Sequence, residues 1–231
     1  MLVDIFSSFD DHNFVFMSLY LLMWLCTLTV IAAFNMTFWV TPTRWTHILN
    51  MLKSTIMAQL TRSFGAKLGG FMNTVSALFL MLIFFNLMGL IPYVFSITSH
   101  LAMSLSLGLP LWLSLIIAGA THNPSSAAAS LLPGGAPSVL NPFLVLVETV
   151  SMCVRPITLS VRLVANMSAG HIVLGLLGTY LSSGIFIYPT LAVVTLIVLQ
   201  LFYFIFEVGV ALIQAYIFSL LVTLYSDDHP A

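Results

Sequence analysis

The chain has 231 residues, of which 60% are hydrophobic and only 6% are charged, and its formal net charge is −1. Soluble domains carry about 25% charged residues, so the composition excludes an ordinary soluble domain, and the near-zero net charge gives no sign of a nucleic-acid partner. Lysine, arginine and acidic residues are absent from residues 68–147 and again from 163–206. Such long uncharged stretches predict an all-α polytopic membrane protein, in one membrane domain over residues 1–231. The short segments of alternating polarity typical of a membrane barrel are absent.

The first predicted membrane span is residues 14–34. The acidic N-terminus before it lacks the basic start of a secretory signal and the arginine-rich pattern of a transit peptide, so we expect this span to remain in the mature protein. The next predicted element is an arm at residues 44–67, which holds four of the six basic residues and no acid. Its apolar spacing leaves one face polar, which favours an amphipathic helix lying on the membrane surface. The positive-inside rule then places this arm on the matrix or cytoplasmic side and the N-terminus on the opposite side.

Two further spans are predicted at residues 71–91 and 97–120. Asn86 lies within the first of them and is interpreted as a residue that bonds to a neighbouring helix. Residues 121–139 are rich in Pro, Gly, Ser and Ala, so they are predicted to form a loop. Neither the histidines near the ends of the third span nor the two cysteines have the spacing of metal or haem ligands, and no cofactor is expected.

Two long helical patterns complete the chain, at residues 142–181 and 185–225. Asn141 is the expected cap of the first, with Pro142 at its first position. Each pattern runs for some forty residues, or roughly 60 Å, whereas the hydrocarbon layer is about 30 Å thick. Both helices are therefore predicted to tilt steeply, the first as a continuous helix bent at Pro156. A short loop at residues 182–184 makes the pair a hairpin.

Arg162 is the most informative single residue, because it lies about twenty residues, or roughly 30 Å, from either expected end of its helix. Its side chain cannot reach water simply by extending, so it needs a polar cavity or an anionic partner. Small residues flank it, and these would let another helix approach closely. We therefore expect the anion to come from another subunit. The flanking residues are Ser160, Ala165, Ser168, Ala169 and Gly170.

Polar residues repeat every seven positions on both long helices, which places them on one stripe of each helix. In an antiparallel hairpin the two stripes would run close together. Side chains that hold or relay protons at such spacing are what a proton pathway in lipid needs. The stripes are Glu148, Arg155, Arg162 and Ala169 on the first helix and Gln200, Glu207 and Gln214 on the second. Asn166 lies one turn beyond Arg162, Tyr203 lies one turn before Glu207, and His171 is a further residue of the first helix that can relay a proton.

Structural interpretations of several of these residues remain open. Arg155 can serve structure alone by pairing with Glu148 or Glu207, and Glu148 can be an interfacial residue near its helix start. Gln200 and Gln214 can join helices through hydrogen bonds, and His171 can be a packing residue. For Arg162 the structural interpretation is the weakest, because simpler residues fill a helix interface without the cost of removing a charge from water.

Three segments carry a resemblance to a known family: SVRLVANMSAGH, NLMGLIPY and EVGVALIQAYIFSLLVTLY. Together they resemble subunit a of the F-type ATP synthase in its mitochondrial form, over nearly the whole chain. The resemblance matches Arg162 to the essential arginine of that family. It matches the proton-pathway positions to Glu148, Asn166, His171, Glu207, Gln214 and Tyr216, while Arg155 receives no role.

The resemblance implies a stator subunit without a chemical step of its own, in the mitochondrial inner membrane. Its implied partners are a ring of c subunits, the peripheral stalk and other membrane subunits. Combined with the residues, it predicts two offset proton half-channels against the c-ring, separated by Arg162, which discharges each ring carboxylate so that proton flow drives rotation. The N-terminus is then expected on the intermembrane-space side and the basic arm on the matrix side.

The sequence fits three other classes of membrane protein less well. A haem-binding cytochrome would need paired membrane histidines at ligand spacing, and these are missing. An antiporter-like dehydrogenase subunit would need lysines within the membrane, yet both lysines lie in the arm. A secondary transporter would show an internal repeat, which the halves of this chain lack.

Overall fold

The computed structural model describes residues 25, 28–29, 32, 44–63, 65, 69–91, 96–131, 140–185 and 187–227. Within them the chain forms helices joined by turns, with no strand. Four helices of the described part are long and apolar enough to cross a membrane. The predicted all-α polytopic class is therefore confirmed. The expected span at 14–34 and residues 132–139 of the expected loop fall almost entirely outside the described residues.

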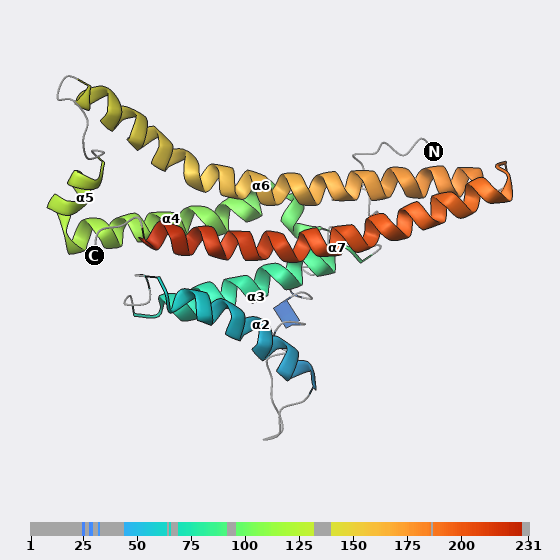
Figure 1. The fold of residues 1–231 in the computed structure, drawn as a ribbon, viewed down its shortest axis with the longest axis horizontal. Coiled ribbons are helices and arrows are strands. Elements are labelled where there is room, and N and C mark those ends of the chain that lie inside the picture. The colour runs from blue at the N-terminus through green and yellow to red at the C-terminus, as the bar shows by residue number, and fades with distance from the viewer. Residues whose placement is uncertain are drawn as a thin grey trace. The chain divides into compact units, whose positions relative to one another are not determined.

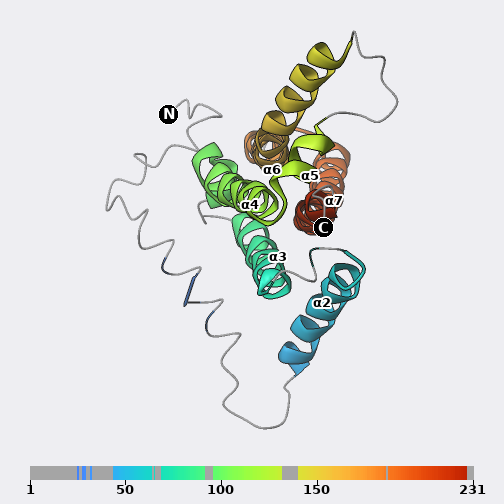
Figure 2. The same ribbon diagram turned by 90° about the vertical axis from the view of Figure 1, so that its left-hand side faces the viewer.

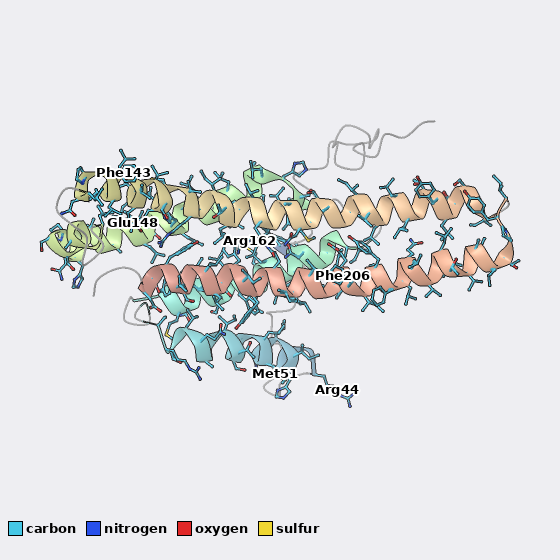
Figure 3. All side chains as sticks on the ribbon, turned by 45° about the horizontal axis from the view of Figure 1, so that its top comes forward. Arg44, Met51, Phe143, Glu148, Arg162 and Phe206 are labelled. Carbon is cyan, nitrogen blue, oxygen red and sulfur yellow. The ribbon has the colours of Figure 1, made fainter. Side chains whose placement is uncertain are left out.

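Helix α2 (Arg44–Leu60) occupies most of the basic arm. Ile56 and Leu60, one turn apart, are almost completely buried, whereas Ile48 and Met51 are exposed; Figure 3 labels Arg44 and Met51 on this helix. After Leu60 the chain turns, and the Ser63 hydroxyl donates a hydrogen bond of 2.7 Å to the Leu60 carbonyl oxygen. The helix therefore ends seven residues before the end of the predicted arm at 67.

Helix α3 (Phe71–Gly89) follows Gly70, whose φ of 85° is a left-handed conformation that favours glycine. Helix α4 (Leu101–His122) is preceded by the short 3₁₀ helix η4 (Ile97–Ser99), so the predicted span at 97–120 begins four residues too early. Within this short helix the Ser99 hydroxyl donates a hydrogen bond of 2.6 Å to the Ser96 carbonyl oxygen.

The predicted loop at 121–139 contains structure that its composition did not indicate. α4 continues to His122, and helix α5 (Pro124–Ser130) begins with a proline at its first position and lies beside the end of α4 (Figure 2). Proline is well suited to a helix start because its missing N–H has no partner there anyway. The prediction of an irregular loop was therefore wrong for residues 121–130.

Helices α6 (Asn141–Gly184) and α7 (Thr190–Asp227) are the two long helices, with 44 and 38 residues. As predicted, α6 is continuous through Pro156, and Figure 1 shows it bending along its first half. Their lengths of roughly 66 and 57 Å exceed the thickness of a hydrocarbon layer about twofold. The side-chain oxygen of Asn141 accepts no hydrogen bond among the described residues, so the expected cap does not form.

The turn between the long helices lies later than predicted. Residues 182–184 belong to the last turn of α6, and α7 begins at Thr190. The backbone N–H of Tyr188 donates to the Gly184 carbonyl oxygen at 2.9 Å, and a side chain at Gly184 would overlap the Tyr188 ring. The prediction of a loop at 182–184 was wrong. These serine and glycine residues form the end of α6, where Gly184 leaves room for the Tyr188 ring.

The chain divides into two compact units that share its long helices. Unit 1 is residues 1–46, 81–100 and 163–215, and unit 2 is residues 47–80, 101–162 and 216–231. The buried apolar residues of unit 1 include Phe85, Leu163, Met167, Ala211 and Ala215, and those of unit 2 include Ile56, Val75, Leu159, Phe218 and Val222. Each unit thus has a core to which α3, α6 and α7 all contribute. The predicted single domain over 1–231 stays a prediction.

Candidate functional site

Arg162 lies at the middle of α6, 21 residues after Asn141 and 22 before Gly184 (Figure 3). Its side chain is exposed, and within the described residues it forms no ion pair or hydrogen bond. The neighbouring Ala165 and Ala169 are exposed as well. A permanent cation on an exposed face of an apolar helix is costly in a membrane unless an anion or a polar cavity compensates it.

Two of the small residues near Arg162, Ser160 and Gly170, pack against other helices of this chain and are not open to another subunit. In unit 2, Ser160 is fully buried and its hydroxyl lies 3.2 Å from the Ser104 carbonyl oxygen of α4. A Cβ at Gly108 of α4 would lie 3.0 Å from the same hydroxyl. Ser160 therefore allows α6 to pack closely on α4. The face of small residues that stays open to a helix of another subunit is narrower than the sequence predicted.

In unit 1 the Glu207 carboxyl group of α7 packs directly on the backbone of α6 at Gly170. Glu207 is 2% exposed, and a Cβ at Gly170 would overlap its Oε1 and Cδ atoms. Only glycine leaves this space free. Oε1 accepts no hydrogen bond from the described residues, while the Tyr203 hydroxyl, one turn earlier on α7, interacts with the carboxyl group.

One turn earlier on α6 and two turns later on α7, the same two helices are joined by a pair of amides. Asn166 Nδ2 donates a hydrogen bond of 2.8 Å to Gln214 Oε1, and Gln214 is 4% exposed. The half-buried His171 follows Gly170 on α6. In unit 1 Asn166 of α6 thus meets Gln214 of α7; the approach of the two full polar stripes stays a prediction. For the half-exposed Gln200, no hydrogen bond is found within the described residues.

Asn86 adds a third helix to this cluster. It is fully buried on α3, and its Nδ2 donates to the Ala211 carbonyl oxygen of α7 at 3.2 Å. The interpretation of Asn86 as a bond to a neighbouring helix is therefore confirmed. Its Oδ1 has no partner among the described residues, so the cluster contains buried acceptors on both Asn86 and Glu207.

In unit 2 the other membrane carboxylate has a charged partner. Arg155 Nη2 lies 3.8 Å from Glu148 Oε1, and the Arg155 guanidinium lies 5.3 Å from the centre of the Tyr225 ring of α7. The first of the two pairings that the sequence left open for Arg155 is thus present. Tyr225 was missed by sequence reasoning, although it lies about three helical turns after Gln214 and therefore on the same face of α7.

Tyr216, also in unit 2, is held by the basic arm. Its hydroxyl accepts a short hydrogen bond from Gln59 Nε2 of α2. Gln59 was not singled out in the sequence, although its position between the buried Ile56 and Leu60 indicates the side of α2 that packs on the protein. Among the residues that the structure describes, no three His, Cys, Asp or Glu side chains gather as metal ligands do.

Comparison with known proteins agrees with the family resemblance of the sequence motifs. Residues 15–227 match the family described as ATP synthase A chain. ATP synthase subunit a of Drosophila melanogaster is 38% identical over 99% of both chains. That of Artemia franciscana is 39% identical over 99% of this chain and 100% of its own. ATP synthase F(0) complex subunit a of Lycodon semicarinatus is 39% identical over 80% of this chain and 82% of its own.

Proposed function

Because this chain belongs to the ATP synthase A chain family, we propose that it is the stator subunit of the proton-translocating membrane sector. It crosses the mitochondrial inner membrane several times and works against a rotating ring of c subunits, beside the peripheral stalk and other membrane subunits. Its N-terminus faces the intermembrane space and the basic arm of α2 faces the matrix, in keeping with the positive-inside rule.

The observation that carries the proposal is Arg162: a permanent cation, exposed midway along α6, with no partner in the described chain. A c-ring carboxylate supplies the missing anion. The carboxylate is expensive in lipid when ionised but tolerated opposite Arg162. Each ring carboxylate therefore loses its proton on approach to Arg162 and regains one before it returns to lipid.

Protons enter and leave through two offset half-channels, which Arg162 separates because a guanidinium stays charged and repels protons. The pathway residues are Glu148, Asn166, His171, Glu207 and Gln214, with Gln200, Tyr203 and Tyr216 beside them. The contacts of Asn166 with Gln214 and of Glu207 with Gly170 support a connected polar path in unit 1. The membrane potential supplies about 2.3 kcal/mol per proton for each 100 mV, which directs the rotation.

The test is Arg162→Ala in the complete ATP synthase reconstituted into vesicles. Leaving a ring carboxylate without its cation costs about 3–5 kcal/mol, so proton-driven ATP synthesis falls by more than roughly a hundredfold while the complex still assembles. Thr158→Ala, an exposed change one turn earlier on α6, is the matched control and retains synthesis. Synthesis at the normal rate in Arg162→Ala would refute the role of this residue.

A further inference from the structure

Unit 2 contains a cluster of three side chains for which neither the sequence motifs nor the proposed function supplies a complete explanation. Glu148 and Arg155 come from α6, and Tyr225 comes from the last turn of α7. The side chains of Arg155 and Glu148 are 27% and 36% exposed. They are thus partly shielded, although they are charged residues of a long apolar helix.

The geometry of the ion pair follows from the helix. Glu148 and Arg155 are seven residues apart, nearly two full turns, so they share one face of α6. Helical side chains lean toward the N-terminus of their helix, which directs the long arginine back toward Glu148. The separation of 3.8 Å is too long for a hydrogen bond. Arg155 therefore attracts the carboxylate without occupying its oxygens, which remain open to a proton.

The same guanidinium also contacts α7. Its central carbon lies 5.3 Å from the Tyr225 ring centre, within the range of a cation–π interaction. Guanidinium is planar, so one arginine can present its face to a ring and its edge to a carboxylate, which the compact ammonium of lysine does less well. Arg155 thereby links the part of α6 that carries Glu148 to the last turn of α7.

We propose that Arg155 is a positioning residue for proton transfer, which holds the Glu148 carboxylate at a fixed place relative to α7 through its contact with Tyr225. The proposal rests on the proposed role of Glu148 in the proton pathway. A purely structural link between two apolar helices needs no charge, since an apolar side chain of similar size packs them without desolvating an ion. The charge is useful where a carboxylate must be held while its oxygens stay available.

The test measures proton-driven ATP synthesis, per assembled complex, by the complete ATP synthase in vesicles. The variants are Glu148→Gln, Arg155→Gln and the double substitution. Each single change slows synthesis roughly fivefold, the effect of breaking an interaction between contacting residues. Because Arg155 acts through Glu148, the double variant is about as slow as the slower single variant. Arg155→Lys, which keeps the charge, recovers a substantial part of the rate.

The contact with α7 is tested at Tyr225. Tyr225→Phe keeps the aromatic face and synthesises ATP faster than Tyr225→Leu, which removes the ring and slows synthesis toward the rate of Arg155→Gln. These changes keep an apolar residue on α7, so they remain informative should Arg155→Gln prevent assembly. Equal rates for the Phe and Leu variants overturn the contribution of the aromatic ring.

The outcomes separate this inference from the function on which it rests. If Glu148→Gln slows synthesis but Arg155→Gln does not, or if their effects multiply in the double variant, Arg155 does not act through Glu148 and the inference is wrong while the pathway stands. If Glu148→Gln has the normal rate, Glu148 leaves the pathway and the inference fails with it. The proposed role of Arg162 is unaffected in either case, because its own variant tests it.

Discussion

The two units hold their membrane carboxylates by different physical means. In unit 1, Glu207 is 2% exposed and fits against the bare backbone of Gly170. In unit 2, the Glu148 side chain is 36% exposed and lies 3.8 Å from the Arg155 guanidinium. Shape positions the first carboxylate and charge positions the second. Each therefore depends on a partner of a different kind, and a substitution at each partner should have a different signature.

The largest effect is expected at Gly170. A methyl group there overlaps the Glu207 carboxyl group, and overpacking of this kind typically costs about 1–3 kcal/mol. Gly170→Ala should displace the carboxyl group and reduce proton-driven ATP synthesis about as much as Glu207→Gln does. Glu207→Asp, which is shorter by one methylene, should recover part of the rate in the Gly170→Ala background.

Gly175 provides the matched control on the same helix, because a Cβ there meets nothing within 4 Å. Gly175→Ala should leave synthesis unchanged and slightly stabilise α6 through its better helix propensity. If both alanine variants reduce synthesis equally, the loss comes from a less flexible α6, and the shape argument for Glu207 fails.

An intermediate effect is expected for the amide pair of unit 1. Asn166→Ala leaves the buried Oε1 of Gln214 without its 2.8 Å donor, and an unpaired buried polar group costs about 1–3 kcal/mol. The assembled complex should lose heat stability and synthesise ATP more slowly. In a double-mutant cycle, adding Gln214→Ala should cost less than it does alone, since both partners are then absent. Additive losses would show that the hydrogen bond contributes nothing.

The smallest effects concern the contact between α2 and α7 in unit 2. Gln59→Ala removes one hydrogen bond to the Tyr216 hydroxyl, worth about 0.5–1.5 kcal/mol, and should change synthesis by no more than about twofold. Tyr216→Phe removes the same bond together with a hydroxyl of the proposed pathway, so it should slow synthesis further. Equal rates in the two variants would mean that Tyr216 only anchors the arm.

The boundaries of the helices show what local sequence patterns do not predict. α6 and α7 were expected because periodic apolar residues without charge specify long membrane helices from local information alone. Sequence patterns did not predict the start of α4, the helix α5 or the turn after Gly184. The turn after Gly184 accompanies the packing of the Tyr188 ring on Gly184, and α5 begins at a proline; apolar periodicity encodes neither feature.

The sequence by itself determined that the chain is a helical membrane protein with an isolated cation at the middle of a long helix, because hydropathy and the cost of burying charge act on every residue separately. Only the tertiary structure decided the partners: Gln214 for Asn166, Gly170 for Glu207, and Glu148 with Tyr225 for Arg155. Most of these pairs join residues of α6 and α7 that are far apart in the chain. Their contact depends on how the helices pack, which seven-residue spacing restricts to a face but does not assign to a neighbour.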